Sequence, residues 1–168
     1  MIEGFYTRLT DVFVLGKPYD RGDGILVKTR SNGPGAKVMG LTLEGKVAYL
    51  SILQIQAGLT LQRSRYDEPH KWHDDAPAEK KIFRTPDTYG YFTATCTPIK
   101  PLSIALSGTY TGRMLVQRMD ITAENAELGK MPERKAEAIR TPRFFDLGVK
   151  LAYDFKLYKT VDLQLNGG

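Results

Sequence analysis

The chain has 168 residues, enough for one domain with a sizeable core, and its 42% apolar and 26% charged content argues against a disordered protein. Its net charge is +5, and its Lys and Arg residues lie mostly in loops and do not form one basic stripe, so we expect no nucleic-acid partner. The single cysteine, Cys96, excludes an internal disulfide and a cysteine-cluster metal site.

The sequence contains neither a secretory signal nor a spanning helix. Its first residues lack a basic segment followed by an apolar run. No apolar stretch approaches the roughly 20 residues that a spanning helix needs. Strands of a membrane β-barrel need only about 9–11 residues of alternating pattern, so a membrane role through strands stays open.

The first part of the chain reads as strands separated by polar loops. We expect a strand over residues 2–15, a loop over 16–24, an extended segment over 24–30, a bend over 32–35 and a strand over 38–49. Residues 53–64 alternate most clearly, with apolar side chains at the odd positions up to Leu61 and mostly Gln, Thr and Ser at the even positions. The short connection before them predicts a tight antiparallel hairpin with the preceding strand.

The second part of the chain repeats this arrangement. We expect a large mobile polar loop over residues 67–85, strands over 87–98 and 102–116, a second polar loop over 117–142, and strands over 144–155 and 161–165. Brief turns over 97–101 and 156–159 join neighbouring strands. The second polar loop has room for a short helix over 121–135, which Gly129 and Pro132 limit.

Long and short connections alternate strictly along the chain. In an up-and-down meander this places every tight turn at one rim and every long loop at the other, as in outer-membrane barrels. The sequence therefore predicts an all-β fold: an antiparallel up-and-down meander of about seven long strands, forming part of an incomplete transmembrane β-barrel.

The apolar faces of these strands meet either lipid or a protein core. The strands often reach 12 or more residues, against a usual length of about 5–6 in soluble sheets. Their polar faces carry mainly small uncharged side chains near mid-strand. Both features favour lipid. The alternative is a soluble small-molecule-binding β-barrel or sandwich, in which the apolar face points inward.

Several short motifs resemble those of one family, the TonB-dependent outer-membrane receptors. Residues 2–13, IEGFYTRLTDVF, are similar to the aFYxxxxDxf strand of that family. Asn32, Ala36 and Gly40 match the next strand, N-x-x-x-A-x-x-x-G-x-E, although Leu41 and Thr42 stand where its glutamate is usual. The R-T-P sequences at residues 84–86 and 140–142 resemble the R-x-P openings of late barrel strands.

The resemblance implies a location in the outer membrane and a role in uptake. Such receptors have a 22-stranded barrel closed by a plug domain, and they bind an iron–siderophore, haem, cobalamin or a glycan at their outer face. The energy-coupling protein TonB drives uptake through contact with the plug. Residues 1–168 resemble the late strands only, so we expect a single partial barrel domain, a fragment without the plug domain and the final closing strand. We do not expect this chain alone to transport a ligand.

Basic and aromatic residues near the long loops are the candidate ligand-binding residues. Guanidinium groups there are suited to an anionic extracellular ligand, although pairing with Asp67, Asp87 or Asp120 is the favoured interpretation. Trp72 is placed either to stack on a ligand or to anchor its loop. The candidates are Arg63, Arg65, Trp72, Arg84, Arg113 and Arg118.

No constellation in the sequence predicts an enzyme, a metal or a cofactor. His70 and His73, with Asp74 and Asp75, have donor types that suit a transition metal, but the set is loose and a solvated loop is the better interpretation. Neither a nucleophile–base arrangement nor a phosphate-binding glycine loop occurs. We therefore expect a protein that is not an enzyme.

Overall fold

The computed structural model describes residues 1–73, 76–121, 134–158 and 161–168, and every regular element within them is a β-strand. No helix in this part of the chain is long and apolar enough to cross a membrane. The strands are β1 (Ile2–Leu9), β2 (Phe13–Asp20), β3 (Leu26–Asn32), β4 (Ala36–Tyr49), β5 (Leu53–His70), β6 (Glu79–Lys81), β7 (Thr88–Ile99), β8 (Leu102–Thr111), β9 (Leu115–Ile121), β10 (Arg134–Arg140), β11 (Phe144–Tyr158) and β12 (Val161–Gly167).

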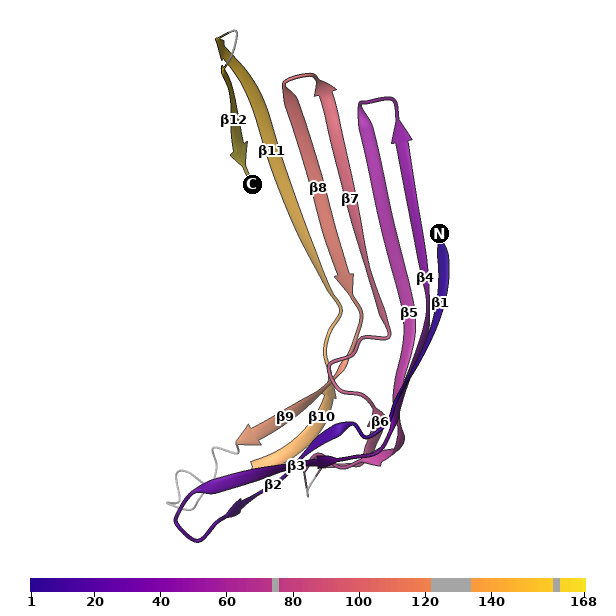
Figure 1. Ribbon diagram of the computed structural model, residues 1–168, viewed down its shortest axis with the longest axis vertical. Coiled ribbons are helices and arrows are strands. Elements are labelled where there is room, and N and C mark those ends of the chain that lie inside the picture. The colour runs from indigo at the N-terminus through magenta and orange to yellow at the C-terminus, as the bar shows by residue number, and fades with distance from the viewer. Residues whose placement is uncertain (74–75, 122–133, 159–160) are drawn as a thin grey trace.

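Seven of these strands follow one another across a single antiparallel sheet. Their order is β1-β4-β5-β7-β8-β11-β12, with β6 paired to β5 beside this path. The sheet is one layer that does not close, so β1 and β12 lie at its two edges (Figure 1). This arrangement confirms the predicted all-β meander and its seven long strands.

Tight turns gather at one end of the sheet and long connections at the other. The β4–β5 and β7–β8 turns lie together at the upper end in Figure 1. The long connections contain the β2–β3 hairpin, strand β6 and the β9–β10 hairpin. Both hairpins bend away from the main strands at the lower end of Figure 1. The alternation of long and short connections is therefore confirmed.

The predicted strand boundaries are wrong near the long-loop end. The strand expected over residues 2–15 is interrupted at Asp11, whose φ of 54° lies in the left-handed region that aspartate tolerates better than most residues. The strand expected over 102–116 ends at Thr111. Gly112 still donates its backbone N–H to the Thr88 carbonyl oxygen, but the next carbonyl oxygens, of Met114 and Leu115, accept from Thr141 and Arg84 instead. Beyond both breaks the chain enters a hairpin that projects from the sheet.

The predicted polar loops contain strands. β2 occupies most of the loop expected over residues 16–24, and β5 continues to His70 inside the loop expected over 67–85. β9 and β10 pair within the loop expected over 117–142, with Arg118 directly opposite Glu137. Charged residues occur on these strands, so apolar alternation does not reveal them. The possible helix lies mostly in 122–133, outside the described residues, and its ends Ile121 and Lys135 belong to strands.

The main sheet has no apolar core on either face. The buried hydrophobic residues of the described chain are Ala36, Ala76, Leu115 and Ala136, and none of them is large and fully buried. In β5, by contrast, Leu59 and Leu61 are 40% and 46% exposed, whereas Thr60 between them is 6% exposed. The polar face is thus the more covered face, which is the reverse of a soluble sheet.

Candidate functional site

Register assigns Arg63 and Arg65 to the apolar face of the sheet. The two strands β4 and β5 pair without a register shift, so Leu61 lies opposite Leu41, Arg63 opposite Met39 and Arg65 opposite Lys37. Alternate residues of a strand share a face. Both exposed arginines therefore continue the apolar row toward the long-loop end, and they do not belong to the polar face.

These two arginines line a shallow hollow at the long-loop end of β4 and β5. Its volume is about 300 Å³, and it is lined by Lys37, Met39, Arg63, Arg65, Tyr66, Asp67 and Lys80. Four of these residues are basic and one is acidic. The Lys37 Nζ lies 2.8 Å from Asp67 Oδ1, and this hydrogen bond to Lys37 lowers the pKa of the Asp67 carboxyl group. The charged Asp67 therefore offsets one of the four positive charges, and the lining of the hollow keeps a net positive charge.

Arg84 and Arg113 lie where the chain leaves the main sheet. Arg84 follows β6 with a φ of 57°, and its backbone N–H donates to Leu115 at 2.7 Å. Arg113 lies between β8 and β9, so backbone hydrogen bonds bring both segments to one crossing. Arg118 lies farther out on β9, in the projecting hairpin. All three side chains are exposed.

Trp72 packs against the connection after β6. Its ring lies 6.3 Å from Phe83 in an edge-on contact and 5.8 Å from His73. The side chain is half-buried, and its buried Nε1 lacks a hydrogen-bond acceptor in the described part of the chain. The contacts suit an anchor of this connection, and stacking on a ligand stays a prediction.

Lysines, and not arginines, bind two of the three aspartates that are expected as pairing partners. Asp67 pairs with Lys37, and Asp87 accepts a hydrogen bond from Lys81 Nζ. The Asp120 side chain lies outside the described side chains. Arginine pairing with Asp67 or Asp87 is therefore absent from the contacts that the structure describes.

The two candidate histidines do not converge on one point with other metal ligands. His70 lies 5.5 Å from the Tyr66 ring, whereas His73 contacts Trp72. Within the described residues, no group of three His, Cys, Asp or Glu side chains is arranged to hold a metal ion. Asp74 and Asp75, the carboxylates of the predicted set, lie outside those residues.

Two features were missed by sequence reasoning, and the first is a polar triad on the sheet. Gln56 Nε2 and the Tyr91 hydroxyl both donate to Glu44 Oε1, at 2.5 and 2.6 Å, and Gln56 also donates to the Tyr91 oxygen at 3.1 Å. The three residues lie on β4, β5 and β7, far apart in sequence, and only the register brings them together. The donors satisfy the carboxylate, so the triad is structural.

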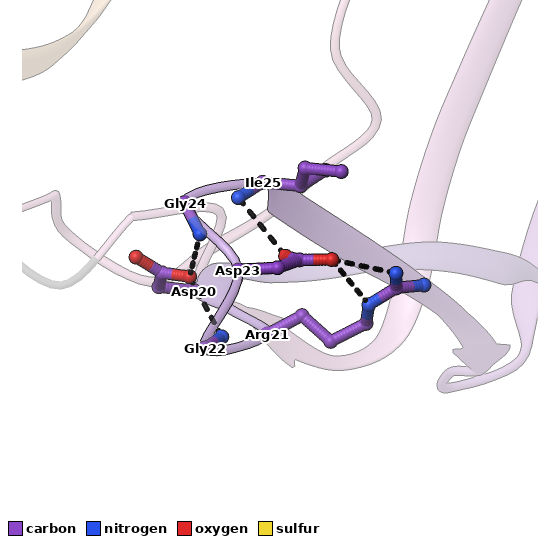
Figure 2. Close-up of polar contacts among 6 residues, drawn as sticks. All are labelled: Asp20, Arg21, Gly22, Asp23, Gly24 and Ile25. Carbon is purple, nitrogen blue, oxygen red and sulfur yellow. Dashed lines mark hydrogen bonds and ion pairs between the residues drawn. The ribbon is translucent and has the colours of Figure 1, made fainter.

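The second missed feature is the tip of the β2–β3 hairpin, drawn in Figure 2. Asp20 Oδ1 accepts from the backbone N–H groups of Gly22 and Gly24, at 2.8 and 3.2 Å. Asp23 accepts from the Ile25 N–H at 3.1 Å and pairs with Arg21 at 2.6 Å. The D-x-G-x-G spacing is the sequence signal for such a turn. Both carboxylates are used within the turn, so it is a structural tip.

Comparison with known proteins yields a structural match. No protein-family model matches the chain, and no curated protein matches it either. The structure is similar to the closed form of the ferric-catecholate import receptor Fiu from E. coli K12, with a TM-score of 0.58 and 16% sequence identity. The match covers 98% of this chain and 20% of that receptor, so the chain spans about a fifth of its length. The chain therefore has the fold of a segment of a TonB-dependent receptor barrel.

Proposed function

We propose that residues 1–168 form one partial barrel domain of an outer-membrane receptor that takes up a scarce ligand. The candidate ligand classes are an iron–siderophore, haem, cobalamin or a glycan. In this proposal the chain supplies barrel wall, with outer-membrane lipid on its apolar face. TonB, the energy-coupling partner, acts through a plug domain and not through these strands.

The observation that carries the proposal is the reversed burial of the sheet. Leu41, Leu43 and Leu59 are about 40% exposed on one face. On the other face the Thr42 and Thr60 hydroxyl groups hydrogen-bond at 3.0 Å. Fully burying one large apolar side chain is worth about 1.5–3 kcal/mol, so a whole apolar face left in water is strongly unfavourable. Lipid removes that penalty without a second protein layer.

The same observation counts against the soluble alternative. A sandwich or a ligand-binding barrel would cover the apolar face with a second sheet or with the opposite wall. In the described residues the apolar face of β4, β5 and β11 is open, and Phe145, Leu147, Val149 and Leu151 are each at least half exposed.

Ligand contact is proposed for the long-loop end. Arg84, Arg113 and Arg118, with Trp72, lie on connections at that end. The matched receptor imports ferric catecholates, which are anionic, and guanidinium groups are suited to such ligands. An anionic chelate is thus the ligand class that this arrangement favours.

The experiment compares the expressed chain in buffer and in lipid. Far-UV circular dichroism and size-exclusion chromatography are measured in plain buffer, in neutral detergent and in phosphatidylcholine vesicles. We expect β-structure only in detergent or vesicles. A monomer that is rich in β-structure in plain buffer would overturn the proposal and favour the soluble binding barrel.

A further inference from the structure

Three basic residues lie directly opposite one another across β1, β4 and β5. Arg8 pairs with Lys37, and Lys37 pairs with Arg65. Residues paired in this way point to the same face, with Cβ atoms about 4.5–5.5 Å apart, and like charges so placed destabilise a sheet. A bound anion would compensate this repulsion.

Apolar residues end where this basic row begins. Leu41 and Leu61 form one cross-strand pair, Met39 and Arg63 the next, and Lys37 and Arg65 the one after. All six residues have the same parity in a continuous register, so they share one face of the sheet. The basic row thus borders the apolar face on the side of the long loops.

One carboxylate compensates part of this basic row. The hollow over the row has four basic side chains in its lining and a single carboxylate, Asp67, which Lys37 binds at 2.8 Å and on which Arg8 and Lys80 also act electrostatically. Neither Arg63 nor Arg65 forms an ion pair with any residue that the structure describes. Both are exposed and free to present their guanidinium groups outward.

We propose that Lys37, Arg63, Arg65 and Lys80 bind the phosphate of an anionic lipid headgroup at the border of the apolar face. This inference rests on the proposed function, because it places lipid against that face. A guanidinium group binds phosphate through two parallel hydrogen bonds, which suits Arg63 and Arg65. A lipid held there by its phosphate would lay its acyl chains along Leu61, Leu41 and the rows beyond. A free anion would interact only with the basic residues of this site and not with the apolar face beside them.

The test measures lipid retention by the full chain. The protein is folded in neutral detergent, phosphatidylglycerol or phosphatidylcholine is titrated in, and bound lipid is counted by native mass spectrometry. A basic residue near an anionic lipid surface contributes about 1 kcal/mol, or about fivefold in affinity. We therefore expect the R63Q/R65Q variant to bind phosphatidylglycerol about 25-fold more weakly, and to retain phosphatidylcholine unchanged.

Two matched variants control for charge and for folding. K46Q/K150Q also removes two positive charges, but from the other face of the sheet, and we expect less than a twofold effect. R63K/R65K keeps the charges and should retain most of the affinity, even if R63Q/R65Q folds poorly. Circular dichroism in the same detergent checks folding of each variant.

Three outcomes would overturn the inference. Equal retention of the two lipids would do so, and so would equal losses in R63Q/R65Q and K46Q/K150Q. Displacement of the lipid by about 10 mM inorganic phosphate would assign the site to a soluble anion. In each case the chain still folds in detergent, so the proposed function stands. A chain that is fully folded in buffer would instead remove the proposed function, and the inference with it.

Discussion

At the scale of single residues, the β2–β3 tip depends on the Asp20 carboxylate. Its Oδ1 accepts from Gly22 and Gly24, whose φ angles of 98° and 78° are costly for other residues. We expect Asp20→Ala to destabilise the turn by about 0.5–1.5 kcal/mol, because two backbone donors lose their acceptor. Hydrogen exchange of the Gly22 and Gly24 amides should become faster by roughly the corresponding two- to tenfold factor.

Asp20→Asn provides the control for this prediction. Asparagine keeps an oxygen in the Oδ1 position, so exchange at Gly22 and Gly24 should stay near that of the unchanged protein. Unchanged exchange in Asp20→Ala as well would mean that the glycine conformations alone determine the turn.

At the scale of elements, Gly108 lets three strands pack across the apolar face. Phe92 of β7 lies directly opposite it, and Phe145 of β11 lies diagonally across, next to its direct partner Leu147. The Phe92 and Phe145 rings stack 6.1 Å apart. A Cβ atom at Gly108 would collide with the Phe92 ring and lie 2.8 Å from Phe145. We expect Gly108→Val to cost about 1–3 kcal/mol of unfolding free energy, measured by urea unfolding in detergent.

Gly45 offers a matched position for comparison. It lies on β4, and a Cβ atom added there has open space within 4 Å. Gly45→Val should be neutral or slightly stabilising, because valine suits a strand better than glycine does. Equal losses at Gly45 and Gly108 would show that β-strand glycines matter here for another reason than the aromatic rings.

The sequence predicted the elements of the main sheet better than those of the projecting hairpins. Alternation along residues 53–64 marks β5 because one of its faces is apolar throughout. β9 and β10 carry Arg118 and Glu137 opposite each other, so no such contrast exists. The breaks at Asp11 and Gly112 depend on backbone conformation and long-range hydrogen bonds, which alternation does not encode.

The candidate site was predicted in part, and the missing step was register. Arg63 and Arg65 share odd numbering with Leu61, so their face was readable from the sequence. Their alignment with Lys37 and Arg8 required the pairing of β1, β4 and β5. The same is true of the Glu44, Gln56 and Tyr91 triad.

At the scale of the whole molecule, the two faces of the sheet should respond differently to charge. Leu59 lies near mid-strand on the apolar face, and Thr93 lies on the other face, beside Gln56. An arginine facing lipid near the bilayer midplane costs about 2–4 kcal/mol, whereas a lumen-facing arginine can stay hydrated. We therefore expect Leu59→Arg to reduce insertion into phosphatidylcholine vesicles by about 30-fold or more. Thr93→Arg should change this insertion by less than about threefold, as measured by vesicle flotation with circular dichroism of the bound fraction.

If Thr93→Arg were instead the more harmful substitution, Thr93 would face the apolar medium, and the assignment of the two faces would have to be reversed. If both substitutions were tolerated equally, neither face would contact lipid, because an arginine that faces water carries no such penalty.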